Sequence, residues 1–130
     1  MSTLKVTNIQ DTAGGNSSTS AEIYSGRAKA WVNFNGTGTV AIRADFNVTS
    51  ITDNTTEDYT VNFTNAMADA NYVSCITAFH TTTAGANSYT SSAAYGGVSQ
   101  TTSSVRMSGM SGTDSGESRD LAYMAVAIFR

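Results

Sequence analysis

The sequence predicts an all-β protein, an antiparallel β-sandwich of jelly-roll-like type that follows an extended N-terminal arm. From residue 27 onward, short segments of alternating apolar and polar residues are separated by turns rich in Gly, Asn and Asp, which is the pattern of half-buried strands. Ser, Thr, Asn and Gly supply 58 of the 130 residues, and these side chains suit strands, turns and an uncharged surface. A chain of this length has room for one such domain.

Residues 1–26 are predicted to form the arm, and residues 27–130 the sandwich. Residues 4–9 have the composition of one short strand, whereas residues 11–20 are a low-complexity stretch with nothing to bury, which is typical of a linker. Because ordering a free arm costs conformational entropy, we expect the arm to dock onto another protein. A disordered tail is the alternative.

We expect about eight strands in the sandwich. The segments that carry the strand pattern are residues 27–34, 40–48, 59–63, 72–79, 89–95, 99–107 and 121–129. The second segment is longer than a usual strand, so we expect a bend or bulge within it. Residues 35–39 contain two glycines that can adopt positive φ, as hairpin loops require. Residues 108–119 are polar and longer than a tight hairpin needs, which predicts a displayed loop.

The last predicted strand is apolar on both faces, although a short helix is the competing assignment. One face of each sheet in a sandwich normally meets water, so the second apolar face needs cover from a loop or from a neighbouring subunit. We favour a neighbouring subunit and expect Met124, Val126 and Ile128 to lie at its interface. Trp31 points away from the apolar face of its own predicted strand and is assigned to the same interface. Packing on a loop of its own chain and stacking on a sugar are the alternatives for Trp31. The chain is therefore expected to self-associate.

Charge and composition argue against two kinds of partner. Ten acidic residues outnumber seven scattered basic ones, whereas nucleic-acid binding needs a basic stripe. No segment approaches the roughly 20 apolar residues of a membrane-spanning helix, so membrane insertion is not predicted. The first residues also lack the apolar core of a secretory signal, and we expect a protein that is assembled in a cytoplasm.

Few residues of the sequence suggest a catalytic, metal-binding or ligand-binding site. His80 is the only histidine and no Gly-x-Ser-x-Gly elbow is present, so we predict no enzyme and no cofactor. Acidic and amide side chains at residues 53–58 offer oxygen ligands for calcium, but their spacing is not that of an EF-hand, and no metal is assigned. Cys75, the only cysteine, is predicted to be a buried, inert thiol. Tyr89 and Tyr95 lie beside long polar loops and are candidate contacts for a glycan, since sugars bind through stacking and hydrogen bonds.

Residues 26–43 read GRAKAWVNFNGTGTVAIR and are followed by FNV at 46–48, SITDN at 50–54 and YTVNF at 59–63. This series resembles a module of tail-fibre-like proteins of cyanophages and other marine bacteriophages, and the match covers residues 26–79. Residues 2–11, STLKVTNIQD, resemble the short opening strand of such proteins. The resemblance implies a trimeric component of the virion near the host-contacting end of the particle, and it implies no catalytic residues.

These expectations combine into one predicted function, a structural protein on the exterior of a bacteriophage particle. We expect a homotrimeric subunit of tail-fibre type that attaches the particle to the host cell surface, where a glycan is the candidate receptor. Its arm would bind other virion proteins. A capsid decoration protein, which would use the same arm on the head shell, is the alternative. A glycan hydrolase would need two acids facing a groove, whereas most acids here fall in predicted turns.

Overall fold

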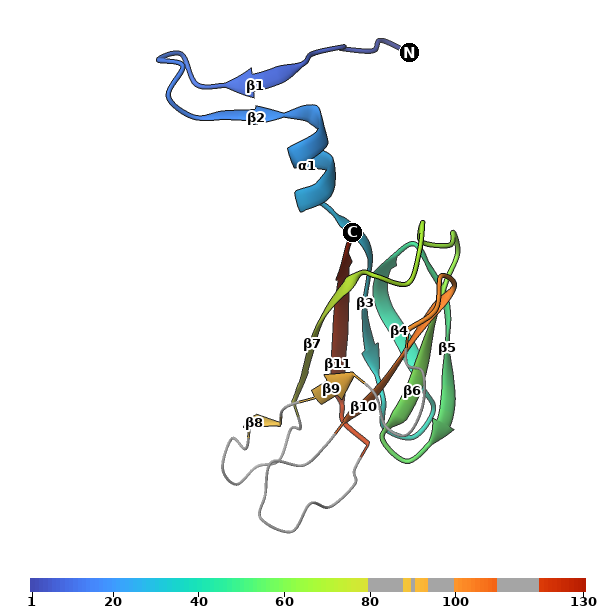
Figure 1. Ribbon diagram of the computed structural model, residues 1–130. Helices are drawn as coiled ribbons and strands as arrows, with labels where there is room; N and C mark the ends of the chain where they lie inside the picture. The colour runs from blue at the N-terminus through green and yellow to red at the C-terminus, as the bar shows by residue number, and fades with distance from the viewer. Residues whose placement is uncertain (80–87, 90, 94–99, 110–119) are drawn as a thin grey trace.

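A computed structural model describes residues 1–79, 88–89, 91–93, 100–109 and 120–130. Two antiparallel sheets pack against each other, and an arm at the N-terminus projects away from them (Figure 1). The predicted all-β antiparallel sandwich is confirmed. The five-stranded sheet has the order β4-β3-β11-β7-β8, and the four-stranded sheet has the order β5-β6-β10-β9. The strands are β3 (Ala28–Asn35), β4 (Ala41–Phe46), β5 (Val48–Thr55), β6 (Asp58–Phe63), β7 (Val73–Phe79), β8 (Ser88–Tyr89), β9 (Ser91–Ala93), β10 (Ser104–Gly109) and β11 (Tyr123–Phe129).

The core lies between the sheets and is built from every second residue of the central strands. On β3 and β6 the alternation that the sequence predicts is confirmed, because one face of each strand is buried and the other is partly exposed. Phe34 and Tyr59 meet edge to face in this core, with ring centroids 5.3 Å apart. The inward residues of four strands are Ala30, Val32, Phe34, Tyr59, Val61, Phe63, Val105, Met107, Met124, Val126 and Ile128.

The assignment of Met124, Val126 and Ile128 to a subunit interface is wrong. All three side chains are buried in the core of their own chain. The reason is the register of β11 against β3, which places Met124 opposite Phe34 and Val126 opposite Val32. Directly opposed residues of an antiparallel pair share one face of the sheet. The face of β11 that remains partly exposed is therefore the other one, which carries the residues of odd number.

The predicted bend in segment 40–48 is confirmed at Asn47, which has a φ of 57° and separates β4 from β5. Asparagine tolerates this left-handed conformation better than most residues. Its side-chain amide donates to the carbonyl oxygens of Lys29 (3.0 Å) and Asn65 (3.1 Å), and its side-chain oxygen accepts from the amide of Asn65 (2.8 Å). At this bend the chain passes from an edge of one sheet to an edge of the other.

The arm contains more secondary structure than the sequence analysis predicts. β1 (Asn8–Gln10) and β2 (Ser17–Thr19) form a hairpin that leads into α1 (Ser20–Gly26). In the turn of the hairpin, the Asp11 carboxylate accepts from the Gly15 amide at 2.9 Å. None of the first 26 residues is buried, so the arm adds nothing to the core of the sandwich. Within the described ranges, no helix has the length and apolar character that a bilayer crossing requires.

Gly36 has a different role from the one that its position in a hairpin loop suggests. Gly38 has a positive φ of 62°. Gly36 is needed for another reason, because neighbouring atoms approach its Cα too closely to leave room for a side chain. A Cβ atom on Gly36 would lie 2.7 Å from the Tyr59 hydroxyl and 2.8 Å from the Leu121 carbonyl oxygen. This contact joins the β3–β4 loop to the segment that precedes β11, and it helps to fix the pairing of β11 with β3.

Candidate interaction surfaces

The outer face of the five-stranded sheet carries a row of apolar side chains across four strands. Phe46 of β4 lies opposite Trp31 of β3, Trp31 lies opposite Ala127 of β11, and Ala127 lies opposite Cys75 of β7. Opposed residues share a face of the sheet. Phe46 is 47% exposed and Trp31 is 39% exposed. The prediction that Trp31 points away from the core is confirmed, and its assignment to a subunit interface stays a prediction.

The same face continues toward the ends of β7 and β11. Val73 lies opposite Phe129 and is 64% exposed. Cys75 is also exposed, so the prediction of a buried thiol is wrong. The physical reason is that β7 turns its other face, with Ala78, toward the core. We call the set of Trp31, Phe46, Val73, Cys75, Ala125, Ala127 and Phe129 the outer apolar face.

An arginine borders this outer apolar face at one end of the sheet. Arg43 is the extra residue where the register of β4 against β3 shifts. Its guanidinium donates to the carbonyl oxygens of Phe34 (2.8 Å) and Ala122 (2.6 Å) and lies 4.4 Å from the centroid of the Tyr123 ring. A guanidinium over an aromatic ring is a favourable arrangement. Arg43 therefore ties β3, β4 and the start of β11 together at this border.

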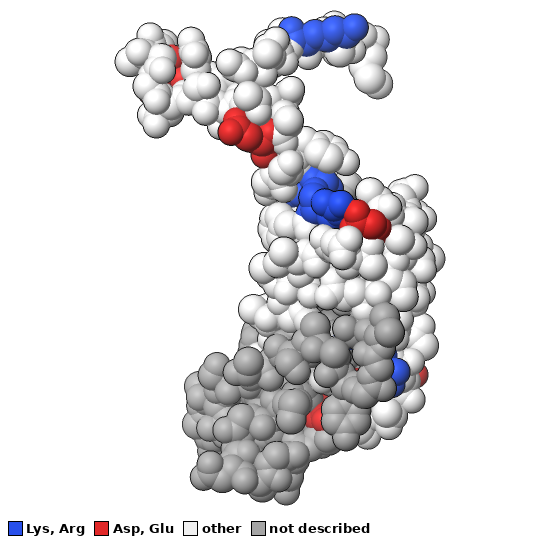
Figure 2. All heavy atoms as spheres, viewed as in Figure 1, with Lys and Arg blue, Asp and Glu red and all other residues white. Residues whose placement is uncertain are grey.

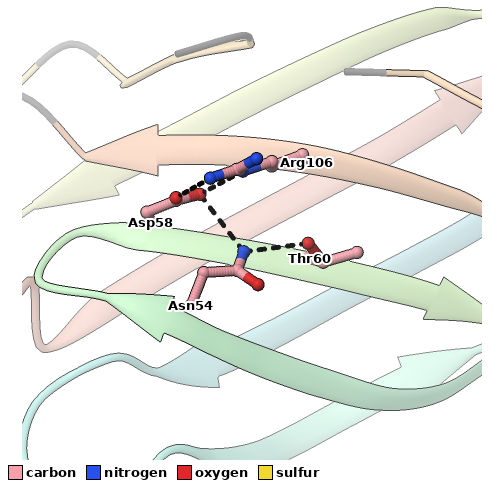
Figure 3. A network of polar contacts seen from close by, with 4 residues as sticks. All are labelled: Asn54, Asp58, Thr60 and Arg106. Atoms are coloured by element: carbon pink, nitrogen blue, oxygen red, sulfur yellow. Dashed lines mark hydrogen bonds and ion pairs between the residues drawn. The ribbon is translucent and has the colours of Figure 1, made fainter. Parts of the chain in front are cut away.

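The outer face of the four-stranded sheet has the opposite character. Its outward residues on β5, β6 and β10 are polar and bond to one another across the strands. Asn62 donates to the hydroxyls of Ser50 (3.1 Å) and Thr52 (3.0 Å). Asn54 donates to Thr60 (2.9 Å) and to a carboxylate oxygen of Asp58 (3.2 Å), as Figure 3 shows. Polar side chains that satisfy one another in this way suit a face in contact with water.

Asp58 is the charged centre of that polar face (Figure 3). It is buried, and both its carboxylate oxygens accept from the Arg106 guanidinium, one of them from Nε at 2.7 Å. These hydrogen bonds from Arg106 hold the pKa of Asp58 below its ordinary value, although burial acts in the opposite direction. Asp58 is one of the oxygen ligands considered for calcium, and here it is the partner of an arginine. Among the described residues, no group of three His, Cys, Asp or Glu side chains could hold a metal ion.

A groove of about 690 Å³ lies where the arm joins the sandwich. Three basic residues line it, Arg27, Lys29 and Arg130, together with the aromatic rings of Tyr24 and Phe46. Figure 2 shows basic atoms gathered at this junction, with acidic atoms next to them. No pattern in the sequence indicated the groove, because its lining comes from the end of α1, the chain around the start of β3 with Arg27 and Lys29, the β4–β5 bend with Phe46 and Asn47, the segment 64–68, and Arg130.

The arm itself displays several exposed apolar side chains. Leu4 is 85% exposed and Ile9 is 59% exposed, and both lie on or before the β1–β2 hairpin. Val6, Ile23 and Tyr24 are also exposed. Apolar side chains gathered on a projecting segment are a feature of regions that contact other proteins.

The two tyrosines proposed to contact a glycan are placed only in part. The backbone of Tyr89 belongs to β8 and pairs with Ala78 of β7, which locates it at an edge of the five-stranded sheet. Tyr95 and His80 lie outside the described residues. The glycan assignment of Tyr89 and Tyr95 therefore stays a prediction.

Comparison with known proteins yields no relative of this chain, since no family model, no curated protein and no solved structure matches it. The resemblance to tail-fibre-like proteins thus rests on the quoted sequence runs alone.

Proposed function

We propose that this chain is a structural, non-enzymatic subunit of tail-fibre type on a bacteriophage particle, which takes part in attachment to the host. The observation that carries the proposal is the difference between the two outer faces of the sandwich. On one face, amide side chains such as those of Asn54 and Asn62 bond to hydroxyl groups of neighbouring strands, and the other face presents Trp31, Phe46 and Val73 to the outside. An apolar sheet face of this kind is suited to burial against another copy of the chain.

The proposed assembly is a homotrimer in which the outer apolar face of each subunit is covered by its neighbours. Apolar area removed from water contributes roughly 25 cal/mol per Å², so several large side chains on one flat face favour association. In a cyclic trimer the contacts are heterologous, so one part of the face on each copy meets a different part of the face on the next copy. The odd-numbered face of β11, with Ala125, Ala127 and Phe129, lies at the centre of the outer apolar face.

The arm supports attachment to a larger structure. It projects from the sandwich (Figure 1) and exposes Leu4, Ile9 and Ile23. We infer that these side chains bind another virion protein. The opposite end of the sandwich, which includes β8 with Tyr89, would then be turned toward the host.

Two measurements test this proposal. Light scattering of the purified chain should give the mass of a trimer, and immunogold labelling should place the chain on the tail of the particle. Labelling of the head would favour the decoration protein instead. A monomer at micromolar concentration that does not bind to particles lacking the protein would contradict both.

Host contact has its own test. Replacing both Tyr89 and Tyr95 with alanine should reduce the adsorption of particles to host cells. Unchanged adsorption by a correctly folded double variant would remove these two residues from the host-contacting surface.

A further inference from the structure

The groove at the base of the arm is lined by basic side chains that have no part in the functions considered above. Three of the seven basic residues of the chain line it. Among the described residues, Asp69 is the acid that pairs with one of them, through an ion pair with Arg130. The volume of about 690 Å³ falls within the range of small-molecule sites. The groove therefore combines a positive charge with space for a ligand.

The basic residues differ in how far they are already engaged. The ammonium of Lys29 donates to the carbonyl oxygens of Tyr24 and Arg27 and lies 3.8 Å from the centroid of the Tyr24 ring. Arg130 is held by Asp69. Arg27 lies 5.5 Å from the Tyr24 centroid, and its guanidinium has no ion pair among the described residues. Arg27 thus keeps the most unused hydrogen-bond donors of the three cations, since a guanidinium carries five.

The local charge is not neutralised around Arg27 and Lys29. The pKa of Lys29 lies below its ordinary value, first because of desolvation and second because of the nearby charge of Arg27. Two cations that repel each other in this way attract an anion placed between or beside them.

The remaining lining of the groove suits a ring with hydroxyl groups. Tyr24 and Phe46 are both more than 45% exposed and offer aromatic surface. Ser25, Thr64 and Asn65 add hydroxyl and amide groups. Asn65 is fixed by hydrogen bonds to Asn47, including one of 3.0 Å between the two side chains, so this part of the groove is held in place before any ligand binds.

We propose that this groove binds an acidic saccharide, with Arg27 contacting its carboxylate or sulfate and with Tyr24 and Phe46 packing against its rings. A bidentate contact from a guanidinium to an oxyanion is the strong form of such a pair. The proposal concerns direct binding by the chain. Phe46 also belongs to the outer apolar face, so a neighbouring subunit that covers Phe46 would compete with the saccharide for this ring, whereas Tyr24 and Arg27 lie outside that face.

Calorimetric titration of the full chain tests the proposal, with trigalacturonate and a sulfated galactose trisaccharide as acidic probes and neutral galactotriose as the reference. We expect at least one acidic probe to bind and the neutral one to bind at least about tenfold more weakly. The affinity should fall with rising salt, because the contact is ionic. Equal binding of all three saccharides, or binding of none, would overturn the proposal.

Variants locate the site. Arg27→Gln should weaken binding about tenfold, and Phe46→Ala roughly threefold. Lys5→Gln removes the same charge from the exposed start of the arm and should leave the affinity unchanged, so it is the matched control. Both groove side chains are at the surface, and an unchanged urea midpoint would show that each variant is folded. Wild-type affinity in Arg27→Gln, or tighter binding of a Glu-rich peptide than of either acidic saccharide, would refute the assignment.

Discussion

Tyr59 shows how a single hydroxyl connects distant parts of the chain. Its oxygen lies 2.8 Å from the carbonyl oxygen of Gly36 and 2.8 Å from a carboxylate oxygen of Asp120. One phenolic proton is thus shared between two acceptors. Burial and the nearby Asp120 raise the pKa of Tyr59 far above its ordinary value, so the hydroxyl keeps its proton. The same Asp120 oxygen accepts from the Glu57 amide at 2.7 Å.

Replacing Tyr59 with phenylalanine should therefore destabilise the sandwich. The ring would still fill its place beside Phe34, but the Gly36 carbonyl and the Asp120 carboxylate would lose a donor, which costs about 1–3 kcal/mol. Urea unfolding measures this loss as a lower midpoint. Tyr24→Phe, which removes an exposed hydroxyl from the arm, is the matched control and should leave the midpoint unchanged. Equal midpoints for Tyr59→Phe and wild type would mean that this bond does not stabilise the fold.

The lowered pKa of Asp58 predicts how the stability of the folded chain depends on pH. Because its pKa is lowered in the folded chain, the unfolded chain binds a proton more readily, and stability falls as the pH decreases. The contribution of Asp58 is fully present above the pKa of the unfolded state, near 4, and is lost as the pH falls through the lower, folded value.

In Asp58→Asn this contribution is absent. The unfolding free energy of the variant should therefore change less between pH 7 and pH 3 than that of the wild type. Asp69→Asn is the comparison. Arg130 and the Asn71 amide also hold the pKa of Asp69 below its ordinary value, but this pair is exposed on both sides and water screens it, so Asp69→Asn should change the pH dependence less than Asp58→Asn does. A pH dependence that is the same in Asp58→Asn and wild type would exclude Asp58 as the source.

At the scale of elements, the sequence predicts which residues of β3 and β6 face the core, but it does not predict which residues of β11 do. β3 and β6 have apolar residues on one face only, so their alternation identifies the core side. β11 is apolar on both faces, and its inward side is decided by its pairing with β3 and β7. Pairing register is a long-range property that no local pattern contains.

The same limit applies to the candidate surfaces. The outward direction of Trp31 follows from its own strand. Phe46, Cys75 and Val73 join it only because β4, β11 and β7 are neighbours in the sheet. The groove at the base of the arm combines five separate segments, and three of its residues are cations that look scattered in the sequence.

The helix α1 in the arm, by contrast, is indicated by a local sequence pattern. Thr19 and Glu22 form a capping box, in which the Thr19 hydroxyl accepts from the Glu22 amide (3.1 Å) and the Glu22 carboxylate accepts from the Thr19 amide (2.7 Å). A Thr followed by Glu three residues later is a recognised helix start. The low complexity of residues 11–20 concealed it, because seven helical residues without an apolar face give no periodicity.

Thr19→Ala should remove this cap and destabilise α1 by about 1 kcal/mol. We expect the Cα chemical shifts of residues 20–26 to move toward random-coil values. The unfolding midpoint of the sandwich should stay constant, because no residue of α1 is buried. Thr12→Ala, at an exposed position in the same arm, is the control and should leave both quantities unchanged. Helical shifts that persist in Thr19→Ala would show that α1 does not depend on its cap.

At the scale of the whole molecule, the two outer faces of the sandwich lead to opposite expectations for an added charge. Lysine at position 31 would place an ammonium within the outer apolar face, where association would have to desolvate it. Lysine at position 52 would add the same charge to the exposed polar face of β5. Trp31→Lys should therefore reduce the mass measured by light scattering to that of a monomer, and Thr52→Lys should leave it unchanged. Dissociation by Thr52→Lys alone would move the proposed interface to the four-stranded sheet. A wild-type mass in both variants would mean that neither outer face forms the subunit interface.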